Sequence, residues 1–166
     1  MEIVEAAGVS VAVVAGACAG PDFERALEAD LRIAGGDSSF STAGVGDPVA
    51  CGVRLARLLG EARAKELILA ARTVDAASAL RLGLVTRVVP GASLGDTARA
   101  LTEQLRALPP LALAAVRDAV RAVRDLTPEA ALKREHEHFR RLIATQDHQA
   151  AVAAFFERRE AAFTGE

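Results

Sequence analysis

Over the first ninety residues of the chain, short apolar runs alternate with segments whose apolar residues recur at helical spacing. Residues 3–14 are largely apolar and β-branched around a central glycine, which predicts one or two short strands. Residues 31–34 predict another strand, and between these runs Phe23 and Ala26 share one helical face with Leu27. The next expected elements are helices over 49–59 and about 62–71, a short helix between Asp75 and Gly83, and a strand over 84–89.

From Ser93 onward the apolar spacing is helical throughout. Thr127 is expected to cap a helix that starts at the proline and glutamate following it in the sequence. Asp147 is expected to cap the last helix. The pattern therefore predicts a mixed α/β core over residues 1–92 and a C-terminal helical region over 93–166, together one structural unit.

The stretch from Val11 to Asp30 combines a buried strand, a turn of small residues and the start of a helix. Gly16 and Gly20 interrupt the apolar run, and Pro21 stands where a first helical residue is expected. A helix that begins directly after a strand directs free backbone N–H groups and a positive dipole end towards a ligand oxygen.

This stretch resembles the signature of the enoyl-CoA hydratase/isomerase (crotonase) family, Asn-Gly-x-Ala-x-Gly-Gly-Gly-x-Glu-Leu-Ala-x-x-x-Asp. The matching positions are Gly16, Cys18, Gly20, Glu24, Ala26 and Asp30. Three later stretches, 54–69, 75–85 and 145–165, are also similar to family motifs, so the resemblance extends from about Val11 to the end.

The resemblance implies an α/β fold with a reduced crotonase-like ββα spiral core. It implies a coenzyme A thioester as ligand, without a further cofactor, near Gly16, Ala17, Cys18 and Ala19. It also implies association into a trimer-based homo-oligomer or with a complementary chain. A sheet without the family's N-terminal elements would leave an edge and an apolar face to be covered.

Family members polarise the thioester carbonyl with two backbone N–H donors, each contributing roughly 3 kcal/mol to transition-state stabilisation. One donor belongs to a segment preceding the matched region, and we expect this chain to start too late to contain it recognisably. The other falls on Pro21, which has no N–H. The neighbouring amides of Gly20 and Asp22 are the possible replacements.

Hydration also uses two carboxylates that share one water molecule. Glu24 matches the first, although a carboxylate in a first helical turn is also stabilised by the helix dipole alone. The second position falls on Gly44. Asp47 lies nearby, but we favour a capping role for it before Pro48 and the following helix.

Three functions remain open on these residues. The first is a non-catalytic subunit or acyl-CoA binder with impaired or absent hydratase activity. The second is a divergent isomerase or lyase that uses Glu24 to act on an acyl-CoA. The third is one half of a split crotonase that a partner chain completes.

Composition and residue spacing disfavour several other functions and sites. The net charge of −2 and the absence of Trp and Tyr disfavour nucleic-acid or anionic-membrane binding. The apolar run from Val9 to Ala19 lacks the basic residues of a signal peptide, so a cytoplasmic protein is expected. His136 and His138 are two residues apart on a predicted helix, too poorly aligned to share a metal, and no metal is expected. Cys18 is interpreted as a small core residue, with a reactive thiol as the less favoured alternative.

Overall fold

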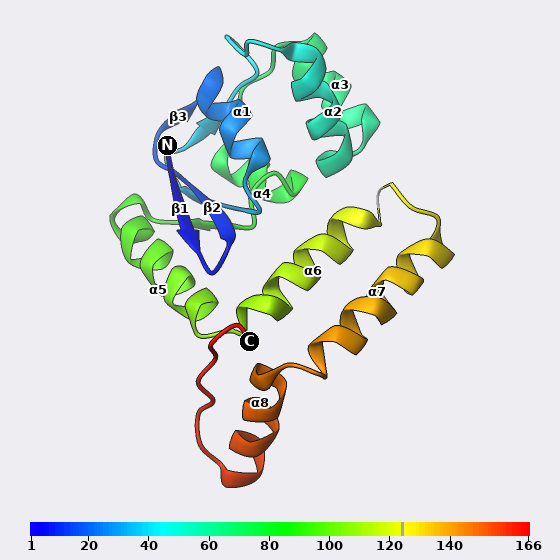
Figure 1. Ribbon diagram of the computed structural model, residues 1–166. Coiled ribbons are helices and arrows are strands. Elements are labelled where there is room, and N and C mark those ends of the chain that lie inside the picture. Colours follow the sequence, from blue (N-terminus) through cyan, green and yellow to red (C-terminus); the bar gives the residue numbers. More distant parts are fainter. Residues whose placement is uncertain (124) are drawn as a thin grey trace. The chain divides into compact units, whose positions relative to one another are not determined.

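The computed structural model describes residues 1–123 and 125–166 (Figure 1). The described residues form two compact units, Met1–Glu5 with Ser10–Thr102, and Ala6–Val9 with Glu103–Glu166. The division falls inside helix α5 (Leu94–Arg106), ten residues beyond the expected boundary at 92/93. The buried positions of this helix, Leu94, Ala98 and Thr102, all belong to the first unit, which explains the later division.

The larger sheet has the strand order β1 (Glu2–Ala6), β2 (Val9–Val14), β4 (Leu31–Gly35) and β7 (Arg87–Val89). β4 pairs in parallel with both β2 and β7. The strand expected over 84–89 is shorter than predicted. The amides of Leu84 and Val85 both donate to the carbonyl of Ala79, so these residues close the preceding helix instead of entering the sheet.

The smaller sheet consists of β3 (Ala17–Cys18), β5 (Ser39–Phe40) and β6 (Val74–Asp75). The sequence did not predict these strands, since two residues carry no readable alternation. Phe40 stands alone among small polar residues in the sequence, yet it is buried against Phe23 with ring centroids 6.4 Å apart. This aromatic pair joins the small sheet to helix α1.

The helices of the first unit are α1 (Pro21–Glu28), α2 (Pro48–Leu59), α3 (Glu61–Leu69) and α4 (Ala76–Leu82), with a single 3-10 turn at Gly91–Ser93. They confirm the helices predicted from periodicity. Asp75 caps α4 by accepting a 2.6 Å hydrogen bond from the Ser78 amide, and Gly83 ends it in the left-handed conformation with φ of 82°.

Arg32 on β4 is buried and connects three segments of the first unit. Its Nε donates to the Leu84 carbonyl at 2.8 Å, and its Nη1 donates to the Ala29 carbonyl at 2.7 Å. Ala29 is the C-cap of α1. The guanidinium therefore lies at the negative end of that helix, where a cation is stabilised.

The second unit contains helices α6 (Pro110–Ala122), α7 (Pro128–Leu142) and α8 (Gln146–Glu157). Thr127 caps α7, as predicted, by accepting a hydrogen bond from the Ala130 amide. The prediction for Asp147 is wrong, because Thr145 is the cap of α8. Asp147 is buried in the first turn of α8, and its carboxylate accepts hydrogen bonds from the amides of Thr164 (2.7 Å) and Gly165 (3.0 Å).

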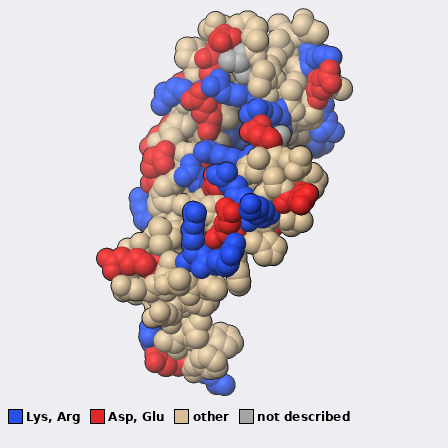
Figure 2. Space-filling model, turned by 45° about the vertical axis from the view of Figure 1, so that its right-hand side comes forward, with Lys and Arg blue, Asp and Glu red and all other residues tan. Residues whose placement is uncertain are grey.

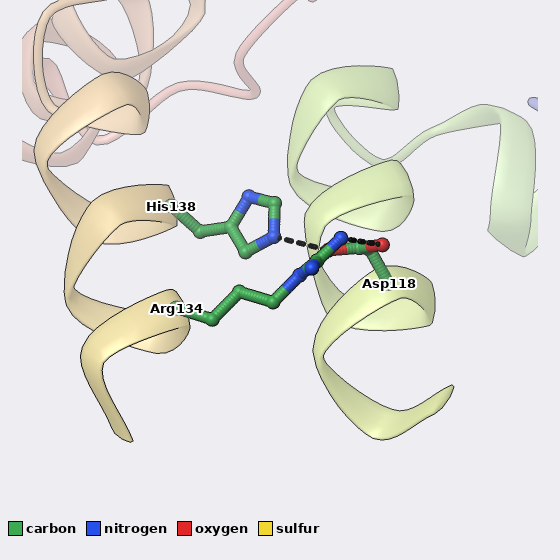
Figure 3. A network of polar contacts seen from close by, with 3 residues as sticks. All are labelled: Asp118, Arg134 and His138. Carbon is green, nitrogen blue, oxygen red and sulfur yellow. Dashed lines mark hydrogen bonds and ion pairs between the residues drawn. The ribbon is translucent and has the colours of Figure 1, made fainter. Parts of the chain in front are cut away.

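A polar cluster joins α6 to α7 (Figure 3). The Asp118 carboxylate accepts hydrogen bonds from Nε and Nη2 of Arg134 at 2.5 and 2.8 Å, and it lies 2.6 Å from Nε2 of His138. Arg134 first, and then His138, lower the pKa of Asp118 from 3.8 to about 2. His138 and Arg134 are one helical turn apart, so both reach the same carboxylate.

Large apolar side chains are exposed on the three helices of the second unit and at the C-caps of α6 and α7. They include Val116, Val120, Val123, Leu132, Phe139, Ile143, Val152, Phe155 and Phe156. Figure 2 shows one face of the molecule, on which Lys and Arg side chains intermingle with Asp and Glu between uncharged surface. In the part of the chain that the structure describes, every helix is too short or too polar to cross a bilayer.

Candidate functional site

The N-terminus of α1 follows the small sheet directly. Gly20 is its N-cap, with φ of 58°, and its carbonyl accepts hydrogen bonds from the amides of Phe23 and Glu24. Only glycine suits this position, because its φ is positive and because a Cβ there would lie 3.0 Å from the Gly44 carbonyl oxygen. Pro21 is exposed at the first helical position.

The backbone nitrogens of Gly20, Pro21 and Asp22 differ in whether they can donate a hydrogen bond to a ligand. Pro21 has no N–H. The Gly20 N–H donates to the Ala43 carbonyl at 2.9 Å, so it is already engaged within the chain. The Asp22 N–H lies in the first turn, where amides have no acceptor inside the helix. Of the two replacements expected from the sequence, the Asp22 amide is therefore the one that geometry favours.

Glu24 points towards the loop that precedes α2. Its Oε1 accepts hydrogen bonds from the amides of Gly46 at 2.5 Å and Asp47 at 3.2 Å. The same loop carries the Ala43 carbonyl that binds Gly20. Backbone groups of residues 43–47 thus engage both the amide before Pro21 and the carboxylate that matches the family's first catalytic position.

Asp47 takes the capping position that the sequence favoured. Its Oδ1 accepts a 3.0 Å hydrogen bond from the Val49 amide, and its carbonyl accepts one from the Cys51 amide. This geometry is typical of an N-cap, and it confirms the capping interpretation. The carboxylate is therefore directed at the backbone of α2.

Residues 16–19 form the edge of the site next to β5. The carbonyls of Gly16 and Cys18 accept hydrogen bonds from the amides of Ser39 and Ser41. The side chains of Ala17 and Ala19 are exposed, whereas Cys18 points into the core. This alternation leaves a strand surface of small side chains beside the start of α1.

The two cysteines are core residues. Burial, and secondarily the Asp22 carboxylate, raises the pKa of the Cys18 thiol to about 11. Burial, followed by the Glu24 carboxylate, also raises the pKa of Cys51. A raised pKa leaves little thiolate at neutral pH, which argues for the core interpretation of Cys18.

Asp30 has a structural role. Its Oδ2 accepts hydrogen bonds from the amide and the hydroxyl of Ser10 at 2.9 and 3.0 Å, and its own amide donates to the Ser10 hydroxyl. These bonds fix the turn after α1 to the start of β2, and so hold α1 beside the parallel sheet.

Sequence reasoning missed the part that Ala43 and Gly46 play in the site. Both act through backbone atoms, which no side-chain pattern reveals. The glycines of 44–46 indicated only a loop. Within residues 1–123 and 125–166, no three His, Cys, Asp or Glu side chains come together as a metal site would require.

The fold is that of crotonase-type proteins. An enoyl-CoA hydratase from Bacillus anthracis superposes with a TM-score of 0.87 and 32% sequence identity, covering 94% of this chain and 62% of that one. An enoyl-CoA hydratase subunit from Geobacillus kaustophilus superposes with a TM-score of 0.86 at the same identity, with the same coverage of each chain.

Sequence comparison gives the same family. A model described as enoyl-CoA hydratase/isomerase matches residues 1–166. The short-chain-enoyl-CoA hydratase of Clostridium acetobutylicum is 33% identical over 154 residues, which are 90% of this chain and 59% of that protein. The carnitinyl-CoA dehydratase of Citrobacter koseri is 35% identical, over 93% of this chain and 62% of its own length.

The chain belongs to the enoyl-CoA hydratase/isomerase family. It spans about three fifths of the length of these relatives.

Proposed function

We propose that this chain binds a coenzyme A thioester, and that its own site adds water to an enoyl thioester slowly or not at all. The observation that carries this proposal is Pro21 at the first position of α1, where the family's oxyanion donor belongs. Loss of one such donor slows a reaction by about 10²- to 10³-fold.

The remaining groups do not readily replace what is lost. The Gly20 amide is bound to Ala43. The Asp22 amide belongs to a residue whose side chain is itself a carboxylate in the first turn of α1. The negative charge of this carboxylate opposes the negative charge of an oxyanion developing nearby. Glu24 is the one carboxylate aligned with the family's catalytic pair, since the second position is Gly44 and Asp47 caps α2.

Thioester binding is supported by the parts of the site that persist. The N-terminus of α1 provides a positive dipole end, and the exposed edge of residues 17–19 carries only small side chains. Both features suit the close approach of a carbonyl oxygen and an extended ligand to the backbone.

The test compares binding with turnover in the purified chain. Calorimetry with crotonyl-CoA, and with free coenzyme A as reference, should detect binding of the thioester. The absorbance assay for its hydration should give a rate near the background. Brisk hydration that Glu24→Gln abolishes would overturn the proposal in favour of an active hydratase. Isomerisation or proton exchange lost in the same variant would instead support a Glu24-dependent isomerase or lyase.

We further propose that the exposed apolar positions of α6, α7 and α8 are covered by other chains. Monomeric proteins rarely expose large apolar patches, and these helices carry many large apolar side chains that solvent reaches. A homo-oligomer, trimer-based by family resemblance, should appear in light scattering at micromolar concentration, and Phe155→Ser with Phe156→Ser should weaken it. A monomer that assembles only when a complementary chain is added would favour the split-protein alternative.

A further inference from the structure

The segment before α2, residues 43–47, runs past the start of α1, and we call it the strap. At the beginning of the strap, the Ala43 carbonyl accepts the Gly20 amide at 2.9 Å. The carbonyl oxygen of Gly44 lies 3.0 Å from the place that a Cβ of Gly20 would take. The backbone of the strap therefore lies directly against the N-cap of α1, where the proposed function places the thioester carbonyl.

Glu24 holds the second half of the strap. Its Oε1 accepts the amides of Gly46 and Asp47 at 2.5 and 3.2 Å. Hydrogen bonds to an ionised acceptor are roughly twice as strong as those between neutral groups. The carboxylate that matches the family's first catalytic position thus fastens the strap to α1 through two charge-assisted hydrogen bonds.

The residues on either side of the strap are fixed without Glu24. Thr42 is buried, and its hydroxyl donates to the Leu67 carbonyl at 3.1 Å. Beyond the strap, the first turns of α2 are anchored by Cys51, which is fully buried. The strap can therefore leave α1 while the segments that flank it stay in place.

The strap itself has few contacts that would keep it closed without Glu24. Ala43, Gly44 and Gly46 are exposed, and Val45 is the strap side chain that packs against the core, where it is half-buried. Gly44 has a φ of 73°, and the two glycines allow the backbone around Val45 many conformations. Segments with few buried apolar contacts and exposed hydrogen bonds open at low free-energy cost.

We propose that the strap is a displaceable cover of the thioester site, held closed by Glu24, and that a coenzyme A thioester binds by displacing it from α1. The inference rests on the proposed function, because it takes the thioester carbonyl to lie at the start of α1. Displacement breaks the hydrogen bond between Gly20 and Ala43. The freed Gly20 amide can then donate to the thioester oxygen together with the Asp22 amide.

Glu24 is in this proposal a positioning residue, because it acts on the ligand through the strap. When a ligand binds only the open form, its apparent dissociation constant is the intrinsic one divided by the fraction of open molecules. Removal of the Glu24 carboxylate raises that fraction, so it should tighten thioester binding. A Glu24 that contacted the ligand directly would act in the opposite sense, since its removal would weaken binding.

The first measurement needs no variant. Hydrogen exchange of the Gly46 and Asp47 amides is followed by NMR in the purified chain, with free coenzyme A as the reference and with saturating crotonyl-CoA. Because the thioester separates the strap from Glu24, exchange of both amides should accelerate by about threefold or more. A ligand that bound beneath a closed strap would slow the same exchange.

The second measurement uses Glu24→Ala, with Glu28→Ala as the matched control. Glu28 is also a carboxylate of α1, but it pairs with Arg54 within α2 at 2.6 Å. Glu24→Ala should speed exchange of the Gly46 amide by about tenfold and tighten crotonyl-CoA binding, measured by calorimetry, by about threefold or more. Glu24→Gln keeps an uncharged acceptor and should give intermediate values, whereas Glu28→Ala should change neither quantity.

The outcomes separate the two proposals. Unchanged or slower exchange of the Gly46 and Asp47 amides with crotonyl-CoA bound to the wild type would overturn the strap inference and leave the proposed function standing. Unchanged or weaker binding by folded Glu24→Ala would also overturn the inference. Absence of thioester binding by both proteins would overturn both proposals. Binding by Glu24→Ala alone would support the strap and overturn thioester binding by the wild-type chain.

Discussion

The Gly20 amide donates a 2.9 Å hydrogen bond to the carbonyl of Ala43. This bond engages the amide immediately before Pro21, in a region where the family places an oxyanion donor. At the start of α1, one backbone nitrogen is therefore a tertiary amide without a hydrogen, and the N–H of its neighbour is already bound.

Restoring an N–H at the first helical position should raise activity. Pro21→Ala supplies the missing donor without changing α1, because alanine is a favourable helical residue. We expect crotonyl-CoA hydration to increase at least tenfold, with about 10²- to 10³-fold as the upper range for one donor. Steady-state kinetics measures the effect, and Pro21→Ala combined with Glu24→Gln is the control. A gain that persists in the double variant would show that Glu24 takes no part.

Asp47 should matter for stability and not for turnover. Asp47→Ala removes the acceptor of the Val49 amide and should lower the free energy of unfolding by about 1 kcal/mol. Asp47→Ser retains a capping oxygen and should recover most of that loss in urea denaturation. A loss of turnover in Asp47→Ser at unchanged stability would contradict the capping role.

Cys18 should make the protein sensitive to alkali. Its pKa rises from 9.0 to about 11 on folding, so above pH 9 the unfolded state releases a proton that the folded state retains. Stability is then complete below pH 9 and falls as the pH approaches 11, by roughly 2–3 kcal/mol for this group. Denaturation at pH 7 to 11 tests this. Cys18→Ala, which installs the family's residue, should flatten the profile. An identical slope in both proteins would assign the effect to other groups.

The stability that the Asp118 cluster contributes should be lost at acidic pH, in contrast to the alkaline loss expected for Cys18. Its pKa falls from 3.8 to about 2 in the folded chain, so its contribution is present above pH 4 and is lost as the pH falls towards 2. The protection factors of the α7 amides, which compare their exchange with the intrinsic rate at each pH, should therefore fall over this interval. Asp118→Asn should exchange faster at pH 6 and show a weaker change below pH 4. Equal protection in both proteins at pH 6 would mean that the cluster does not stabilise the helix pair.

Asp147 should hold the C-terminal segment. Asp147→Ala leaves the amides of Thr164 and Gly165 without their acceptor, at a cost of about 1–3 kcal/mol to the second unit. Exchange of these two amides should increase by at least tenfold, whereas Asp147→Asn, which keeps one acceptor oxygen, should give an intermediate rate. Unchanged exchange in the alanine variant would show that the segment is held by other contacts.

The helices and the parallel strands were largely predictable because each is specified locally. Caps such as Asp75 and Thr127 sit beside the residues whose amides they bind, and apolar periodicity marks the buried face. The small sheet was not predictable, because its two-residue strands exist only where Phe40 meets Phe23 in the core. The capping prediction for Asp147 failed because Thr164 and Gly165 compete for the same carboxylate from seventeen and eighteen residues away.

The sequence by itself determined the family, the start of α1 at Pro21 and the absence of an N–H there, since covalent structure alone decides whether a residue can donate. Only the tertiary structure decided which groups engage the neighbouring amide and Glu24. These partners come from the backbone of residues 43–47, about twenty positions away, and backbone atoms are the same for nearly every residue type.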